Sequence, residues 1–245
     1  MERTVQLFAL LFIVFQIFTS CIYSNQHVVQ GSHQLINQRI DIDNYDEVIL
    51  NIPGEVYYQQ FSDSAPYLQI HTDDNIFNAM DVKVQNNKLI LDVKKDSILR
   101  PSKLTIYTCS HNINQVSVRG SGKMILKGEV NSNDLDLKIT GSGNLIADSL
   151  LCNNLSVNIT GSGNAHLTGA SNQSSYKITG SGDIKAFDFF VQNLTCGISG
   201  AGNIEVFVSN KLDVNITGAG NIIYRGEPQS IDKKITGSGK IKQEK

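Results

Sequence analysis

The 245-residue chain has no tryptophan, only 4 prolines and 4 cysteines, and few charged residues, which make up 18% of it. Its formal net charge of −2 implies neither a nucleic-acid partner nor a strongly anionic membrane as a partner. Once Cys21 is set aside, Cys109, Cys152 and Cys196 are odd in number, which argues against a disulfide framework. The 5 histidines have no metal-ligand spacing, and no Gly-x-Ser-x-Gly or phosphate-binding motif occurs. We therefore expect no metal, no cofactor and no nucleic-acid partner.

Glycine, in contrast, is plentiful, and most of the 20 glycines lie in a short phrase, Gly-Ser-Gly or Gly-Ala-Gly, that occurs seven times. The glycines of this phrase are Gly120 and Gly122, Gly141 and Gly143, Gly161 and Gly163, Gly180 and Gly182, Gly200 and Gly202, Gly218 and Gly220, and Gly237 and Gly239. Successive first glycines are 21, 20, 19, 20, 18 and 19 residues apart. A period of about 20 residues indicates an array of stacked repeats.

Apolar residues recur at fixed distances from the first glycine of each repeat. Two residues before it stand Val118, Ile139, Ile159, Ile178, Ile198, Ile216 and Ile235, and four residues after it stand Met124, Leu145, Ala165, Ile184, Ile204, Ile222 and Ile241. Polar residues alternate with these columns, as in a strand that faces a core on one side. Each repeat is therefore predicted to be a strand, a Gly-x-Gly corner, a second strand and a return loop. Cys196 lies in a further inward column and is interpreted as a small buried hydrophobe.

One such repeat cannot bury its apolar face alone, so we expect the repeats to stack as parallel strands about 4.8 Å apart, with right-handed connections. Glycine suits the corner because it adopts positive φ and allows close backbone approach. Polar residues beside the corner, such as Thr140 and Asn144, are expected to form hydrogen-bonded ladders. The predicted fold is all-β, a right-handed parallel β-solenoid with rungs of about 20 residues over residues 111–245.

Residues 33–110 lack the Gly-x-Gly phrase but still have strand patterns. Apolar residues alternate from Val48 to a turn at Pro53-Gly54, and two alternating runs flank Asn86-Asn87 as in a β-hairpin. We interpret this segment as the β-rich lead-in of the same domain. It is expected to cap the first rung, because an uncovered solenoid end is an aggregation edge.

The amino terminus has the pattern of an export signal. An apolar run of about a dozen residues, from Leu7 to Phe18, follows Arg3, so residues 1–20 are predicted to be a signal peptide. Phe18-Thr19-Ser20-Cys21 resembles a bacterial lipoprotein box, in which Cys21 would be lipidated and residues 21–32 would form a tether. The alternative is an ordinary signal peptide that is cleaved near Ser24.

Two carboxylates in the repeats raise the question of catalysis. Asp213 and Asp232 occupy the same outward position in consecutive repeats, so they are predicted to lie one rung apart, close to the spacing in retaining glycosidases. No aromatic platform for a sugar accompanies them. A non-catalytic surface is therefore favoured, and a polysaccharide-acting β-helix enzyme, either a glycosidase or a lyase, is the alternative.

Aromatic residues gather between the later corners, at Phe187, Phe189, Phe190, Phe207 and Tyr224. Exposed, they would form a ligand or partner site. Burial at a corner of the solenoid is favoured, because a cluster of exposed aromatic side chains is costly.

The Gly-Ser/Ala-Gly corners, clearest in Gly202-Asn203-Ile204 and Gly220-Asn221-Ile222, resemble those of the bacterial family called putative auto-transporter adhesin, head GIN domain. The asparagine-rich apolar strands, the preceding β segment and the lipoprotein box share this resemblance, which spans residues 41–240. The family has no catalytic residues to transfer. The resemblance implies a non-enzymatic lipoprotein of the cell envelope, anchored at the outer membrane, whose rigid β surface binds a glycan or a protein. The expected partners are the membrane, through the lipid, and this unidentified ligand, and self-association into a homo-oligomer is left open.

Overall fold

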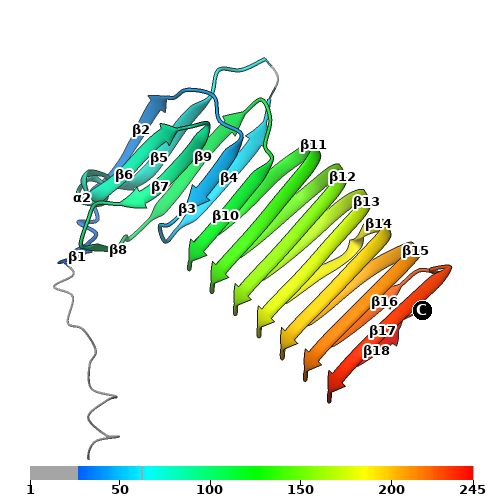
Figure 1. The fold of residues 1–245 in the computed structure, drawn as a ribbon. Helices are drawn as coiled ribbons and strands as arrows, with labels where there is room; N and C mark the ends of the chain where they lie inside the picture. Colours follow the sequence, from blue (N-terminus) through cyan, green and yellow to red (C-terminus); the bar gives the residue numbers. More distant parts are fainter. Residues whose placement is uncertain (1–26, 62, 245) are drawn as a thin grey trace, which may run out of the picture.

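The computed structural model describes residues 27–61 and 63–244, and almost all of them form β-strands. The predicted signal peptide and Cys21 lie outside the described residues. The strands stack along one axis, so that Figure 1 shows a head at the amino-terminal end and a regular array that ends at β18. The predicted parallel β-solenoid is confirmed.

The array has two walls that face each other across the core. The wall before each glycine corner consists of β7 (Lys88–Val93), β3 (Glu47–Leu50), β10 (Gln115–Gly120), the second halves of β11 (Lys123–Gly141), β12 (Asn144–Gly161), β13 (Asn164–Gly180), β14 (Asp183–Gly200) and β15 (Asn203–Gly218), and β17 (Ser230–Gly237). The wall after each corner consists of β9 (Leu104–Ser110), β4 (Glu55–Gln60), the first halves of β11 to β15, β16 (Asn221–Arg225) and β18 (Lys240–Gln243). All of these pairings are parallel, as a stack of identical rungs requires.

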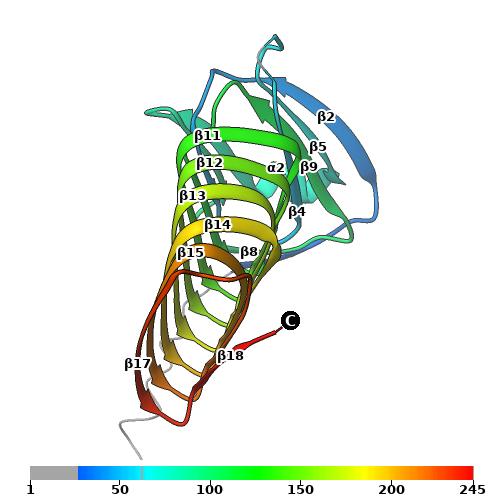
Figure 2. The same cartoon turned by 90° about the vertical axis from the view of Figure 1, so that its right-hand side faces the viewer.

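The return from one wall to the other is not the loop that the sequence predicted. Each of β11 to β15 is one strand of 16 to 19 residues that bends round the edge of the array, as Figure 2 shows along the stack. The ladders shift register at the bend, for example between Leu126 and Glu129. These shifts are β-bulges, which allow a strand to turn while its hydrogen bonds to the neighbouring rungs resume beyond the turn.

At the sharp corner the two glycines of the repeated phrase have different roles. The first glycine has positive φ in all seven repeats, from +85° at Gly120 to +132° at Gly200. The second glycine has an ordinary φ but no room for a side chain, since a Cβ on Gly202 would lie 2.3 Å from the carbonyl oxygen of Gly182. From the second corner onward, the first glycine is required both for its conformation and for close contact with the neighbouring rung, whereas the second glycine is required for contact alone.

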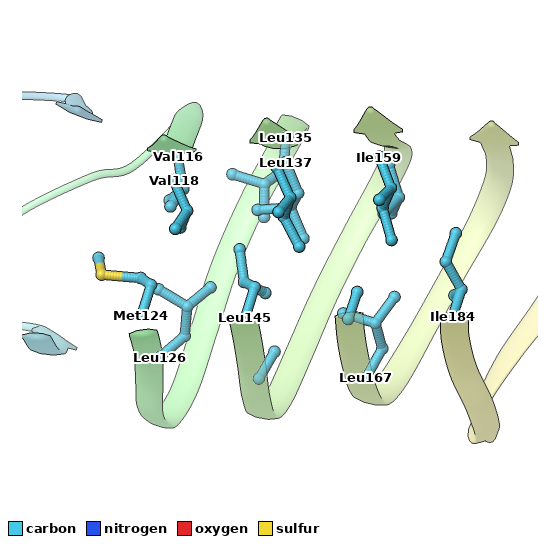
Figure 3. Packing of buried hydrophobic residues seen from close by; sticks show 14 of the residues in the cluster. Val116, Val118, Met124, Leu126, Leu135, Leu137, Leu145, Ile159, Leu167 and Ile184 are labelled. Atoms are coloured by element: carbon cyan, nitrogen blue, oxygen red, sulfur yellow. The ribbon is translucent and has the colours of Figure 1, made fainter. Parts of the chain in front are cut away.

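The predicted apolar columns fill the space between the walls. Figure 3 shows Val116 and Val118 of β10 opposite Met124 and Leu126 of β11, and the same arrangement recurs in the following rungs. In the column two residues before each first glycine, the six side chains from Val118 to Ile216 are at most 2% exposed. Ile235, which continues this column in the last rung, is 37% exposed. The difference arises because no further rung covers Ile235 within the described chain.

Apart from residues 97–100, the strands of the lead-in belong to the same sheet as the repeats, and the lead-in shares their core. The turn at Pro53-Gly54 joins β3 to β4 in the place where a later corner joins the two walls. Its positive φ, +118° at Gly54, falls on the residue in register with Gly122, the second glycine of the phrase, and not on the first. The predicted hairpin is present as β6 (Met80–Gln85) and β7, with φ of +52° and +60° at Asn86 and Asn87. Antiparallel β5 (Tyr67–Asp73) and β2 (Leu35–Asp41) extend the second wall beyond β9. One hydrophobic cluster runs through lead-in and repeats alike.

The start of the described chain is held against the head by Asp73. This residue precedes the short helix α2 (Asp74–Ala79), near β1 (His27–Gln30) and β8 (Ser97–Arg100), which pair with each other. Its carboxylate accepts hydrogen bonds from the backbone N–H of His33, at 2.8 Å, and of Ser102, at 2.9 Å. Burial alone would raise the pKa of Asp73, but these bonds and one from the Ser102 hydroxyl hold it below its usual value. The segment that follows β1 is thus fixed at the head.

Candidate binding surface

Amide side chains form a ladder beside the glycine corners. Asn164 Nδ2 donates to Asn144 Oδ1 at 3.1 Å, Asn203 Nδ2 donates to Asp183 Oδ1 at 2.9 Å, and Asn221 Nδ2 donates to Asn203 Oδ1 at 3.0 Å. These are the asparagine ladders that the repeat predicted. Each bond joins one rung to the next, so the ladder stiffens the corner edge of the array.

A second amide ladder, which was not predicted, lies at the rounded bend. Asn172 Nδ2 donates to Asn153 Oδ1 at 2.8 Å, and Gln192 Nε2 donates to Asn172 Oδ1 at 3.2 Å. The ladder begins with Asn133, which accepts from Asn153. The sequence does contain a signal for this ladder, because its four residues are 20, 19 and 20 positions apart and so follow the period of the glycine corners. Each of the four also lies eight residues before the first glycine of a corner, in the stretch that was interpreted as a variable return loop.

A shallow polar groove runs along the first wall, next to the bend. Its volume is about 530 Å³, and it is lined by Asn114, Asp134, Leu135, Asp136, Asn154, Leu155, Ser156, Gln173, Ser174, Ser175 and Thr195. Asn114 directly precedes β10, and the other residues come from equivalent positions of β11 to β14. The part of the groove on these four strands extends about 14 Å at one strand spacing per rung. The repeat thereby places amides and hydroxyls in rows along one surface.

The two carboxylates of the groove already have partners. Asp134 accepts a hydrogen bond from Asn154 at 2.7 Å, and Asp136 forms an ion pair with Lys138 at 2.5 Å. Lys138 also donates to Gln115 at 3.1 Å. Asp134 is thereby held by the next rung, whereas Asp136 Oδ1 is buried and has no hydrogen-bond partner among the described residues.

Asp213 and Asp232 lie in register on β15 and β17, one rung apart as predicted. Asp213 is ion-paired with Lys211 at 3.0 Å, and Asp232 is exposed. The hollow beside them holds only about 120 Å³ and has no aromatic residue in its lining, which includes Lys234. Their geometry therefore offers no enclosed position for a sugar between two carboxyl groups.

The predicted burial of the aromatic cluster is wrong for Phe190, which is 54% exposed, although Phe189 is fully buried. Phe187 is half-buried, and the Arg225 guanidinium lies over its ring, 4.0 Å from the centroid. The Phe190 ring packs edge-on against Phe207, with centroids 4.8 Å apart. Neighbouring aromatic residues thus differ in role, because the bend alternately turns them into the core and out to solvent.

The three described cysteines are unpaired and unsuited to catalysis. Burial raises the pKa of the Cys152 thiol to about 12, and it raises the pKa of Cys109 and of Cys196 as well. These thiols are therefore protonated at neutral pH, and a protonated thiol is a poor nucleophile. Cys196 is fully buried in its column, as a small hydrophobe would be.

A family model described as "putative auto-transporter adhesin, head GIN domain" matches residues 44–228. The chain belongs to this family. The match runs from the lead-in through β16, so head GIN domain describes the cap and the repeats together. The family expected from the glycine corners is confirmed.

Solved structures agree with the head GIN assignment. A putative adhesin from Bacteroides fragilis NCTC 9343 is 28% identical, with a TM-score of 0.84 over 88% of this chain and 100% of that one. A putative lipid binding protein from Parabacteroides distasonis ATCC 8503 is 29% identical, with a TM-score of 0.74 over 89% and 100%. A putative adhesin from Parabacteroides merdae ATCC 43184, 24% identical with a TM-score of 0.73 over 89% and 100%, shares the fold. No curated protein matches the chain.

Two further features of the head GIN domain concern only its described residues. Among residues 27–61 and 63–244, no three His, Cys, Asp or Glu side chains come together in a way that could hold a metal ion. Over the same ranges, no helix has the length and apolar character needed to cross a bilayer. The corner glycines and the amide ladders join one rung to the next, and the groove and the bend carry exposed polar and apolar side chains.

Proposed function

We propose that this head GIN protein is an exported, non-catalytic protein of the cell envelope that binds a glycan or a protein in the manner of an adhesin. The supporting observation is the polar groove, in which carboxylate, amide and hydroxyl side chains occupy equivalent positions on four successive strands, β11 to β14. Such a surface is pre-organised, because its groups are fixed by backbone ladders before any ligand arrives. Membership of a family described by adhesion, and relatives named for adhesion, point to the same role.

Anchoring through a lipid on Cys21, at the outer membrane, is part of this proposal. β1 starts at His27, six positions after Cys21, and lies at the head, whereas β18 lies at the opposite end of the stack (Figure 1). The bonds to Asp73 fix the chain at that end. A lipid at Cys21 would therefore hold the head near the membrane and direct the repeats away from it, where a partner can reach the groove.

Replacing Cys21 with Ala is expected to move the protein from the membrane fraction to the soluble fraction, since the lipid is the only anchor proposed. Fractionation of cells that express the parent or the Cys21→Ala variant measures this. Metabolic labelling with a fatty-acid analogue is the companion measurement. Equal labelling of the two proteins would show that Cys21 is not the acylated residue, and membrane retention of the unlabelled variant would contradict the anchor.

The double variant Asp213→Asn, Asp232→Asn separates binding from catalysis. We expect parent and variant to bind the same members of a glycan and protein array with equal affinity, because the two carboxylates lie outside the groove. We also expect neither protein to release sugar from a panel of polysaccharides. Both are to be compared at equal folded concentration, with melting temperatures as the control. Hydrolysis by the parent that disappears in the variant would establish the glycosidase alternative instead.

A further inference from the structure

The rounded bend has a small hollow, which we name the bend notch, that is separate from the polar groove. Leu151, Ala170 and Phe190 are in register on β12, β13 and β14, with Ala170 in the middle. Leu151 is 40% exposed and Phe190 is 54% exposed, and they are the only large apolar side chains exposed on the described rungs β11 to β15. The small Ala170 leaves a hollow of about 270 Å³ between them. The notch is therefore an apolar slot with two walls and a floor.

The width of the notch is set by the stacking of the rungs. Leu151 and Phe190 are two rungs apart, so their strands are separated by about 9.6 Å, twice the ordinary strand spacing. A flat ring in contact with both walls needs about 7–8 Å, twice the optimal separation of two carbon atoms. The edge-on contact with Phe207 restrains the Phe190 ring and so preserves the opening. One six-membered ring fits between the walls.

Fixed amides border this slot. Asn172 and Gln192 line the notch, and both belong to the amide ladder at the bend. A primary amide has two N–H donors and a carbonyl oxygen with two acceptor positions, and the ladder uses only part of this capacity. The remaining donors and acceptors are held in place beside an apolar wall. An amphipathic ring with hydroxyl groups on its rim can use both kinds of surface at once.

We propose that the bend notch binds one pyranose ring of an uncharged glycan. This inference rests on the proposed function and names a ligand class and a subsite for it. The C–H face of the sugar packs against Phe190 and Leu151, and its hydroxyls bind the amides of Asn172 and Gln192. The lining has no charged residue, as it consists of Leu151, Cys152, Ala170, Ser171, Asn172, Phe190, Val191, Gln192 and Ser209.

Two other kinds of occupant fit the notch less well. A sulfated or sialylated sugar would bring a negative charge to a lining that has no cation to pair with it. An apolar side chain from a partner protein would cover the amides of Asn172 and Gln192 without offering them hydrogen bonds, which is unfavourable. A neutral sugar satisfies the amides and the apolar walls together.

The test measures binding of the full chain to an array of neutral gluco-, manno- and galacto-oligosaccharides, printed beside sialylated and sulfated oligosaccharides and extracellular-matrix proteins. Phe190→Ala removes one wall of the notch, and Ala170→Leu fills the slot while both walls remain. We expect each variant to lower the affinity for the neutral oligosaccharides that the parent binds by about tenfold or more. Tyr107→Ala is the matched control, because Tyr107 is an exposed aromatic residue, 44% accessible, stacked on Tyr57 in the head.

The control is expected to bind as the parent does, and the melting temperatures of all variants show that each is folded. Parent-like binding by both folded notch variants would overturn the subsite but leave the proposed function intact. A parent that binds only anionic sugars or only proteins would likewise overturn the neutral glycan without removing the binding role. A parent that binds nothing on the array, nor intact cells, would remove both proposals. Loss of binding in both notch variants, with the control unchanged, supports the subsite.

Discussion

Replacing Ile178 with Asp is expected to abolish cooperative folding of the repeats. Ile178 is fully buried and lies in register with Ile159 and Ile198, so the new carboxylate would enter a core that offers it no cation. The loss of an aliphatic contact and the burial of an unpaired charge together are expected to cost more than about 4 kcal/mol, a large part of the stability of an ordinary domain. The measurement is thermal and denaturant unfolding of purified parent and variant.

The neighbouring residue on the same strand supplies the control. Thr179 is exposed, so Thr179→Asp adds the same charge on the outer face and is expected to change the free energy of unfolding by less than about 0.5 kcal/mol. The two substitutions differ by one position along the chain. A soluble Ile178→Asp protein that melts cooperatively near the parent temperature would mean that the inward face has been assigned wrongly.

Replacing Gly200 with Ala is expected to destabilise the protein by about 2 kcal/mol or more. The backbone there has φ of +132°, and the new Cβ would lie 2.2 Å from the carbonyl oxygen of Gly180 in the rung below. An L-residue pays about 1–2 kcal/mol for a left-handed conformation alone, and the contact with the neighbouring backbone adds to this cost. Denaturant unfolding measures the change as a lower midpoint concentration, provided that the slope of the unfolding free energy against denaturant concentration is the same for parent and variant.

Two other glycines separate the two contributions. A Cβ on Gly197 would meet nothing nearer than Lys177 Cγ at 3.9 Å, so Gly197→Ala is expected to be neutral or to stabilise by about 0.4–1 kcal/mol. Gly120 has φ of +85° but open space around it, so Gly120→Ala should show only the conformational cost. If Gly200→Ala and Gly120→Ala unfold at the same denaturant concentration, close packing of the corners does not contribute to stability.

The repeat region was predictable because every rung presents the same pattern. An aliphatic residue two positions before each corner glycine appears once per rung, and its recurrence removes the ambiguity that a single strand would have. The corner at Gly54 was recognised only as a turn, because there the phrase is Pro-Gly and occurs once. The short helix α2 has no repeat to support it, and it was not predicted.

The bend was less predictable because alternation fails across a bulge. The pairing of β14 with β15 shifts register between Ala186 and Phe190, so the inward or outward direction of Phe190 does not follow from the residues that precede it. Phe189 and Phe190 are adjacent and chemically identical, yet only Phe189 is buried. The sequence showed that aromatic residues gather near the bend but not which of them would line a notch.

Because the corners of successive rungs pair in register, the stack can be shortened or lengthened by whole repeats. Removing Gly161 to Thr179 would join Thr160 to Gly180, which restores the Thr-Gly junction found at each end of the removed segment. The stack would shorten by one spacing of about 4.8 Å, and its remaining corners would keep their partners. The same deletion would remove Ala170 and bring Leu151 beside Phe190. Gain or loss of a single repeat can thus change the length of the stack and the shape of the bend notch in one genetic event.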